Sequence, residues 1–434
     1  MASISTIHTT VSSEVESTLT SFTEVVESAA LTDGTTYYII CHALVDGSAA
    51  NKVFEWRLVD RTNSDTVLSN STMLREPHTM NETQSYYFVG RVTATDAGGG
   101  IAFEQKSATG KTVRTQYVSM MIMDLSEMDS DDIFFANDAT TAAHTGTFAN
   151  RASLTVSSPT SGDIYLMFAW VSTETNNVTI NAEMRLNMVA GTDPAILKPL
   201  ISYEGEDPNE QLNWWFTRPY TMTDDSTTFT IQTRDDDATG SVNQYNESTI
   251  FGLRLNAFEN FSASYTDGET TTTSDDFIQL NTISFTPDTT GDVIAIGSSV
   301  MNPESNRVTT FQRIQIDGTT SPNSQPDSES SASANDATDL LGQGYITKYS
   351  GTGSASATID LDAKREGTGE DVGWLNYALS AFTTKLASTA PINYSAVATQ
   401  TFASGDVASQ PYNSGDVASE TFNSGDVASE VNPS

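Results

Sequence analysis

The side chains best suited to chemistry in this chain are carboxylates that gather in short runs. Asp235, Asp236 and Asp237 are consecutive, and smaller groups surround Asp129 and Asp275. Carboxylates on loops are ligands that calcium prefers. No run has the spacing of a dedicated calcium loop, so a solvated acidic surface is the competing interpretation. Asp235, Asp236 and Asp237 are therefore candidate metal ligands for calcium, and we predict no other cofactor.

The remaining reactive residues predict no catalytic arrangement. The histidines, His8, His42, His78 and His144, have no metal-ligand spacing, and neither an HExxH nor a CxxC motif occurs. Cys41, the only cysteine, adjoins His42. On a strand the two would face opposite sides and could not form a nucleophile–base pair. We therefore expect Cys41 to be a buried apolar residue and the protein not to be an enzyme.

The paired tryptophans Trp214 and Trp215 have the shape of a platform on which a sugar ring could stack. Neighbouring residues of a strand face opposite sides, so only one of the pair can face outward while the other packs into a core. The competing interpretation assigns the pair to a core and to a contact between domains. Because one of the two rings can face outward, a host-surface glycan stays a candidate partner.

Two sequence markers recur with a single period, which indicates three copies of one domain. The first is a glycine turn that leads into an apolar strand, at Gly34, Gly162 and Gly291, with spacings of 128 and 129 residues. The second is an aromatic run that ends in a cation, at Arg91, Arg218 and Lys348, with spacings of 127 and 130 residues. Because the cation recurs at one position, we expect it to form a structural ion pair. A period of this length suits the usual size of a domain.

Short apolar strands separated by evenly spaced turns dominate the repeats, and convincing amphipathic helices are scarce. Alternation of apolar and polar residues gives each sheet one buried and one wet face, as in a two-sheet antiparallel sandwich. We predict β-sandwiches over residues 21–144, 145–270 and 271–387. Residues 1–20 form a candidate N-terminal anchor, and residues 388–434 an extended tail that carries a shorter repeat.

Each copy has the same order of strands after its aromatic run. A turn leads to an alternating strand, at Ile101–Gln105, Phe229–Gln232 and Ile359–Asp362, and then a polar loop precedes a short apolar closing strand. This order resembles the jelly-roll modules of appendage and decoration proteins of tailed bacteriophages and of archaeal viruses, including haloarchaeal ones. The resemblance covers about residues 20–385. It implies an all-β fold of three tandem antiparallel jelly-roll-like β-sandwiches and a role in the virion.

The shorter repeat has a period of ten residues. Each decamer contains one aromatic residue, one Ser-Gly-Asp turn and one valine. The aromatic residues and valines are Phe402, Val407, Tyr412, Val417, Phe422 and Val427. These are candidate partner-docking residues that would fill equivalent pockets on successive domains or on neighbouring subunits. The competing interpretation is a flexible end, because segments rich in Gly and Ser are often disordered.

The charge of the chain excludes several classes of partner. It has 56 acidic and 20 basic residues, a net charge of −36. Such a surface repels phosphate backbones and anionic lipids, so we predict neither nucleic-acid binding nor membrane insertion. The charge is typical either of simple solubility or of a high-salt environment, where screening makes crowded carboxylates tolerable. No signal peptide is visible, although the composition resembles that of surface proteins.

A virion protein reconciles these features, because virions assemble in the host cytoplasm and leave by lysis. We predict a non-enzymatic virion structural protein, either a capsid decoration or turret protein or a tail-fibre component, with a halophilic virus as one interpretation of the charge. Its predicted partners are other virion proteins and further copies of itself in a symmetric homo-oligomer. The alternative is a cell-surface adhesin or carbohydrate-binding β-sandwich protein at the extracellular surface.

Overall fold

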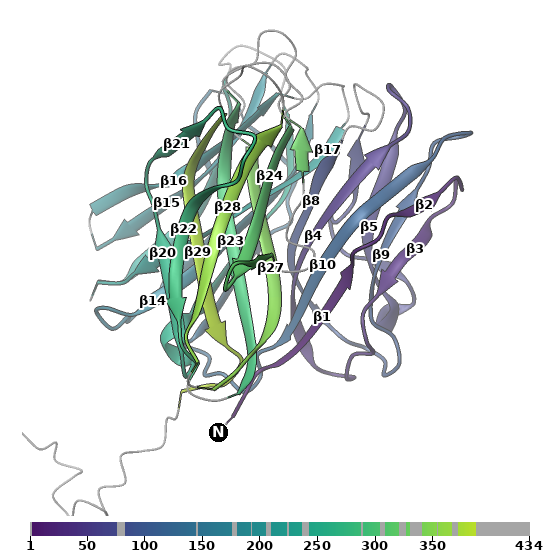
Figure 1. Cartoon of the computed structure of the whole chain (residues 1–434). Coiled ribbons are helices and arrows are strands. Elements are labelled where there is room, and N and C mark those ends of the chain that lie inside the picture. Colours follow the sequence, from purple (N-terminus) through teal and green to yellow (C-terminus); the bar gives the residue numbers. More distant parts are fainter. Residues whose placement is uncertain are drawn as a thin grey trace, which may run out of the picture. The chain divides into compact units, whose positions relative to one another are not determined.

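Strands form almost all of the regular structure in the computed structural model of the chain (Figure 1). The structure describes residues 2–75, 83–144, 146–175, 180–191, 193–204, 210–223, 225–236, 243–287, 290–303, 309–320, 327–329, 341–353, 355–366 and 372–387. Asp237 and the six docking residues of the decamers lie outside these ranges. Among the described residues, no helix has the length and hydrophobicity that crossing a membrane requires.

The first sandwich contains eight principal strands in two antiparallel sheets. The strands are β1 (Ser5–Val11), β3 (Thr23–Glu27), β4 (Thr36–Gly47), β5 (Phe54–Asp60), β7 (Met73–Arg75), β8 (Gln84–Thr93), β9 (Ile101–Lys106) and β10 (Val113–Asp124). One sheet has the order β1-β10-β4-β8, and the other has the order β3-β9-β5-β7. The short strands β2 (Val15–Ser17) and β6 (Thr66–Val67) pair with β10 and β5. Strands alternate between two four-stranded sheets in this way in a jelly roll.

The second sandwich repeats this order. Its strands are β11 (Ile133–Asp138), β13 (Ala149–Val156), β14 (Ile164–Thr175), β15 (Asn181–Ala190), β16 (Asp193–Glu204), β17 (Glu210–Thr221), β18 (Thr227–Asp235) and β19 (Gln244–Arg254). The sheets have the orders β11-β19-β14-β17 and β13-β18-β15-β16, and β12 (Ala142–Ala143) pairs with β19. A single pairing, Gln211 with Leu74, joins β17 to β7 of the first sandwich.

The third sandwich has the same topology again. Its strands are β20 (Phe261–Tyr265), β22 (Ile278–Phe285), β23 (Gly291–Pro303), β24 (Thr309–Ile316), β26 (Asp327–Glu329), β27 (Leu341–Gly351), β28 (Ala357–Glu366) and β29 (Val372–Thr383). One sheet has the order β20-β29-β23-β27. The short strand β21 (Glu269–Thr272) pairs with β29 of this sheet. The other sheet has the order β22-β28-β24, and both β25 (Thr319–Thr320) and β26 pair with β24. The predicted fold class, three tandem antiparallel jelly-roll-like sandwiches, is confirmed.

At each predicted domain boundary, strand pairing assigns a strand to a different sandwich or segment from the one predicted. Ser5–Val11, within the proposed anchor, pairs with β10 of the first sandwich. Likewise β11 pairs with β19, and β20 pairs with β29. Each sandwich therefore begins a few residues after the previous one ends, before the predicted boundaries at 144 and 270. The anchor role of residues 1–20 stays a prediction.

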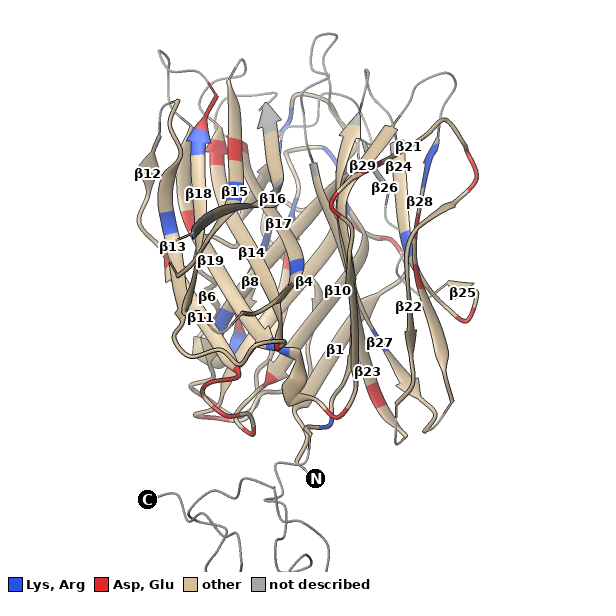
Figure 2. Cartoon of the chain, turned by 90° about the vertical axis from the view of Figure 1, so that its left-hand side faces the viewer, with Lys and Arg blue, Asp and Glu red and all other residues tan. Residues whose placement is uncertain are grey.

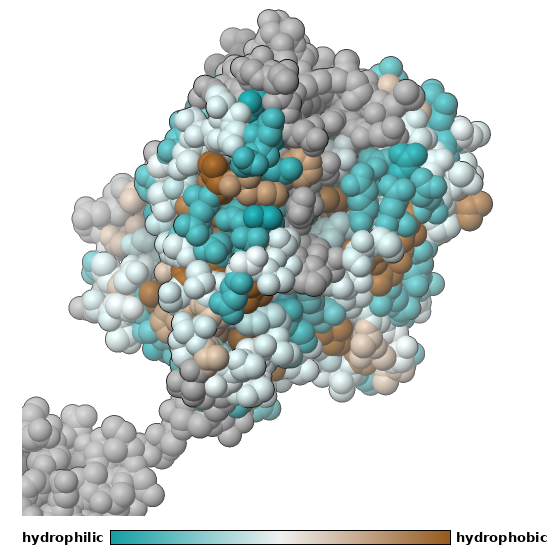
Figure 3. Space-filling view, in the orientation of Figure 1, coloured by the Kyte–Doolittle hydropathy of each residue, from teal (hydrophilic) through white to brown (hydrophobic). Residues whose placement is uncertain are grey.

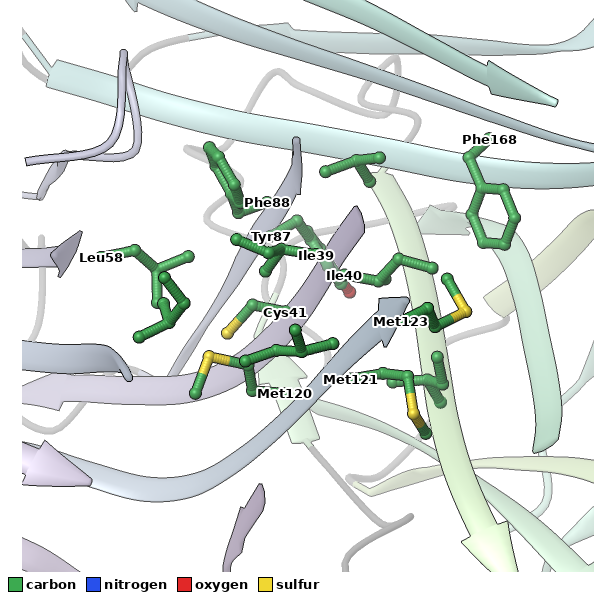
Figure 4. Packing of buried hydrophobic residues seen from close by; sticks show 14 of the residues in the cluster. Ile39, Ile40, Cys41, Leu58, Tyr87, Phe88, Met120, Met121, Met123 and Phe168 are labelled. Atoms are coloured by element: carbon green, nitrogen blue, oxygen red, sulfur yellow. The ribbon is translucent and has the colours of Figure 1, made fainter. Parts of the chain in front are cut away.

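One sheet of each sandwich is buried on both faces, and its side chains explain the apolar runs of the sequence. In the first sandwich, Cys41 and Met120 lie toward Leu58 of the opposite sheet, whereas Met121 and Met123 lie toward Phe168 of the second sandwich (Figure 4). We call these sheets, which contain β4, β14 and β23, the inner sheets. Strands buried on both faces read as continuous apolar runs, whereas the outer sheets keep an alternating pattern.

Candidate functional site

The acidic run at the end of β18 is held by hydrogen bonds from within the second sandwich. The Asp235 carboxylate is only 1% exposed and accepts hydrogen bonds from the Asn243 backbone N–H (2.9 Å) and the Tyr245 hydroxyl (3.1 Å). Burial raises the pKa of Asp235 to about 6. Asp236 accepts a hydrogen bond from the backbone N–H of Asn181.

No metal-binding geometry surrounds these aspartates within the described part of the chain, where no three His, Cys, Asp or Glu side chains are grouped to hold an ion. Asp235 and Asp236 instead tie the end of β18 to neighbouring strands. Asp237 lies outside the described residues, so calcium binding at this run stays a prediction.

Cys41 and His42 face opposite sides of β4, as the strand pattern predicts. Cys41 is buried inside the first sandwich, and burial raises the pKa of its thiol far above the ordinary value. His42 lies on the face of β4 that is turned to the third sandwich. Its ring stacks on Tyr87 of the first sandwich (4.9 Å between centroids) and meets the edge of Tyr345 of the third (5.4 Å). Neither ring nitrogen of His42 has a hydrogen-bond partner among the described residues. The two residues form no nucleophile–base pair.

Trp215 lies where the three sandwiches meet. Its ring is 1% exposed and is centred 5.4 Å from the ring of Tyr87 in the first sandwich. In the third sandwich, a Cβ added to Gly344 would come within 2.5 Å of the Trp215 ring, and the Gly344 N–H donates to the Tyr87 hydroxyl (3.2 Å). Trp214, 6% exposed, packs instead into the core of the second sandwich. The tryptophan pair therefore serves a core and an inter-domain contact, and neither ring is exposed for a sugar.

Buried hydrogen bonds join every pair of sandwiches around Trp215. Trp170 Nε1 donates to Tyr87 O and joins the second sandwich to the first (3.0 Å). The hydroxyls of Thr217 and Ser298 join the second to the third (2.8 Å), and Ser119 Oγ donates to Ile346 O between the first and the third (2.8 Å). Each jelly roll thus contacts both of the others, and the inner sheets form a closed arrangement. We call this buried region the junction.

Two of the three cations that end the aromatic runs link one sandwich to the next. The Arg91 guanidinium lies 4.6 Å from the ring centre of Phe135 on β11, and that of Arg218 lies 4.0 Å from Tyr265 on β20. Lys348 forms an ion pair with Asp292 (3.0 Å). The expected ion pair is thus present for Lys348. Arg91 and Arg218 stack on aromatic rings that the first strand of the next sandwich supplies.

We predict that replacing Arg218 by methionine lowers the free energy of unfolding by about 0.5–2 kcal/mol, the range for a cation held over an aromatic ring. Methionine keeps an apolar stem but removes the charge over Tyr265. Lys348→Met is expected to cost only about 0–1 kcal/mol, because its ion pair with Asp292 lies near the surface. Denaturant titration measures both values. A larger loss for Lys348→Met would contradict this ranking.

A further threefold feature, which the sequence markers missed, lies on the outer sheets. In each sandwich the phenylalanine immediately before an outer strand is covered by an arginine and lies near a second cation. The three sets are Phe22 with Arg57 and Lys106, Phe148 with Arg185 and Arg234, and Phe277 with Arg313 and Lys364. We call them the cation patches. The sequence does contain a sign of this feature, because Arg57, Arg185 and Arg313 are each separated by 128 residues.

The geometry of the three cation patches is closely similar. The arginine lies 3.6, 3.7 or 3.8 Å from the ring centre, and the second cation lies 5.4, 4.4 or 5.2 Å from it. A carboxylate pairs with one cation in the second and third patches, Glu183 with Arg234 and Asp362 with Arg313. In the first patch both cations are paired, Arg57 with Glu104 and Lys106 with Glu55. Such cations are scarce on the described chain, as Figure 2 shows. The cation patches are therefore the candidate interaction site of the outer surface.

Comparison with known proteins gives only distant likenesses. No protein-family model matches the chain, and no curated protein sequence does either. A triple jelly-roll protein from the turret assembly of an archaeal virus is 11% identical, with 86% of this chain and 91% of that chain covered and a TM-score of 0.20.

Two further solved structures are similarly remote. A protein of Sulfolobus turreted icosahedral virus is 13% identical, with 81% of each chain covered and a TM-score of 0.19. A protein of the Gt strain of infectious bursal disease virus is 8% identical, with 89% of this chain and 82% of that chain covered and a TM-score of 0.24. All three belong to viruses, but the TM-scores are too low for any conclusion about this chain to rest on them.

Proposed function

We propose that this chain is a non-enzymatic structural protein of a virus particle, acting as a capsid decoration, turret or tail-fibre component. The observation that carries the proposal is the junction, where Trp215, Tyr87 and Gly344 lock three jelly rolls into one body. Jelly rolls occur in viral capsids and in lectins, and a fold alone does not assign a function. A body whose three domains are fixed by buried contacts is suited to act as a rigid building block.

The reactive side chains that the sequence offered support this proposal, because each is engaged in packing. Cys41 is buried in a core, His42 stacks in the junction, and Asp235 accepts hydrogen bonds at the end of a strand. The structure thus uses these groups to hold strands and sandwiches together.

The outer surface supports a particle protein that stays soluble between assembly steps. The only large apolar residues exposed in the described chain are Leu19, Val53 and Val67, and the face in Figure 3 is mostly polar. With a net charge of −36, copies repel one another at low ionic strength. At about 1 M salt the screening length falls to about 3 Å, which permits close approach. We propose a halophilic virus and a symmetric homo-oligomer within its particle on this ground.

The proposal is tested by determining whether the chain is a component of purified virus particles. Particles from a culture of the host that carries the gene are purified by density gradient, and antibodies against the chain are applied in immunogold microscopy. We expect the chain to sediment with the particles in a fixed ratio to the other particle proteins and the gold to mark their surface. Free chain on a parallel gradient is the control. A chain found in the cell envelope and absent from particles would overturn the proposal and favour the adhesin.

A further inference from the structure

The three cation patches correspond residue by residue, because strand pairing places equivalent positions opposite one another. Each patch arginine lies across the outer sheet from one polar residue, in the pairs Arg57 with Glu104, Arg185 with Gln232 and Arg313 with Asp362. Each second cation also has a residue opposite it, in the pairs Lys106 with Glu55, Arg234 with Glu183 and Lys364 with Phe311. Opposite charges at such positions form cross-strand ion pairs. The first cation patch has both ion pairs, so its charges are balanced.

The second cation patch lacks one carboxylate of the first, because Gln232 occupies the place of Glu104. Gln232 accepts a hydrogen bond from Arg185 Nε (2.9 Å) but supplies no charge. Arg185 and Arg234 lie over one ring, and Arg234 is paired with Glu183. Burial lowers the pKa of Arg185, and so does the neighbouring charge of Arg234. Among the described residues Arg185 has no carboxylate in ion-pair contact, so this patch keeps a net positive charge.

The third cation patch lacks the other carboxylate, because Phe311 occupies the place of Glu55. Lys364 lies 4.5 Å from the centre of the Phe311 ring. The ring attracts the ammonium group but does not neutralise it. Arg313 is paired with Asp362, whereas Lys364 forms no ion pair within the part of the chain that the structure describes. The third patch therefore also keeps a net positive charge.

The cations of these two patches face the solvent. Met184 and Leu186, the neighbours of Arg185 on β15, are buried in the second sandwich, so Arg185 lies on the other face of the strand. The side chains of Arg234 and Arg313 are 32% and 20% exposed. Because carboxylates outnumber cations by 56 to 20 in the chain, a net positive site on its surface is unusual. The two patches therefore suit an anionic partner.

A second copy of this acidic chain is a partner of that kind. Arginine and aromatic residues are enriched in the cores of protein–protein interfaces, and both patches combine them. At about 1 M salt the long-range repulsion between copies is screened, whereas an ion pair that loses its water in a contact is screened much less. We propose that the second and third cation patches bind carboxylates of a neighbouring copy and so form part of the contact in the homo-oligomer. This inference rests on the self-association included in the proposed function.

Restoring the missing carboxylates tests the contact. Gln232→Glu and Phe311→Glu each give a patch the pair of carboxylates that the first patch has. In sedimentation velocity at about 1 M salt, we expect each substitution to raise the dissociation constant of self-association by about two- to fivefold per contact, the equivalent of one surface ion pair. The double variant should lose more than either single variant. Unchanged association of the double variant, or a wild-type chain that is monomeric at every concentration, would overturn the proposal.

Matched variants separate the effect of the patches from those of total charge and of folding. Phe311→Gln removes the same ring without adding a charge, and Val67→Glu adds the same charge at an exposed position outside the patches. Both should associate as the wild type does, and circular dichroism verifies the fold of every variant. If Phe311→Glu fails to fold, Gln232→Glu carries the test alone. A loss of association in Val67→Glu as large as in Gln232→Glu would contradict a role for the patches.

Carbodiimide cross-linking of mixed isotope-labelled and unlabelled chains locates the partner carboxylates. Lys364 should be joined to carboxylates of the other copy, whereas Lys106 should be joined to Glu55 of its own copy. Links of Lys364 that stay within one copy would rule out the contact at the third patch. A chain that stays monomeric but is retained on an immobilised uronic-acid polymer would assign the patches to a glycan and overturn the proposal. Immunogold labelling of particles decides the virion role separately, so either proposal can fail without the other.

Discussion

Replacing Trp215 by alanine is expected to lower the free energy of unfolding by about 3–5 kcal/mol, the usual cost of removing a fully buried tryptophan. The ring is 1% exposed and contacts both of the other sandwiches, so the cavity would open in the junction. Denaturant titration followed by far-ultraviolet circular dichroism measures the loss. We also expect the variant to unfold in more than one step, because domains that lose their shared contacts unfold more independently.

A double-mutant cycle with Gly344 tests whether that cost arises in the junction. Gly344→Ala alone should cost about 1–3 kcal/mol, because its Cβ would overlap the Trp215 ring. In the Trp215→Ala background the same change should cost much less, since the ring is gone. Gly268→Ala, where nothing lies within 4 Å of the added Cβ, is the matched control and should be nearly neutral. Additive costs for Trp215 and Gly344 would show that they do not share a contact.

The features that sequence reasoning recovered are those encoded by neighbouring residues. The inner strands β4 and β14 follow glycines with positive φ, Gly34 and Gly162, and they read as unbroken apolar runs because both faces of an inner sheet are buried. These signals are local, repeat with one period and suffice to predict three sandwiches. The same pattern explains why Trp215 is buried, because its strand lies in an inner sheet.

The first strands of the second and third sandwiches were harder to assign. Every residue of β20 is half-buried, as is nearly every residue of β11, so neither strand shows the alternation that marks a sheet with one wet face. Neither strand follows a marker glycine. Their partners, β29 and β19, come more than a hundred residues later. Only the completed sheet shows that these strands belong to the sandwich that follows them.

Contacts between distant residues lie beyond what a pattern can show. Arg91 stacks on Phe135, which belongs to the next sandwich. No residue near Arg91 in the sequence indicates this contact, so the sequence alone suggested an ion pair instead. The first cation patch brings Phe22, Arg57 and Lys106 together only because β3, β9 and β5 are neighbours in an outer sheet. The constant spacing of the patch arginines marks them as equivalent, but it does not reveal the ring beneath them.

Mild acid is expected to destabilise the junction through its histidines. Burial lowers the pKa of His42 to about 3, and burial together with the charge of Lys348 lowers that of His8 to about 4. Both therefore stay neutral in the folded protein after the unfolded chain begins to bind protons, near pH 6.5. Stability is fully present above that pH and is lost as the pH falls. Well below pH 6.5 each histidine contributes about 1.4 kcal/mol per pH unit, so the loss from pH 6.5 to 5 reaches about 3 kcal/mol for the pair.

Other groups near the histidines do not reverse this sign. His42 is faced by Tyr87, Tyr117 and Tyr345, whose phenols stay neutral in acid, and His8 contacts Ser119. Asp235, away from the junction, has the opposite effect. Its pKa is raised to about 6, so the folded protein binds a proton more readily than the unfolded chain between that pH and the ordinary value of 3.8, and stability rises there as pH falls.

Two variants separate the opposing contributions of His42 and Asp235 to the pH dependence of stability. His42→Phe keeps an aromatic ring against Tyr87 but cannot bind a proton, so its stability should fall less steeply between pH 6.5 and 5 than that of the wild type. At pH 7 it should be at least as stable, because it removes two buried nitrogens without hydrogen-bond partners in the described structure. Asp235→Asn should show a steeper loss, because it removes the group that gains stability in acid. Denaturant titrations at several pH values measure the slopes. An unchanged slope for His42→Phe would mean that His42 is protonated in the folded state, and the junction would then have to admit water or a counter-ion beside it.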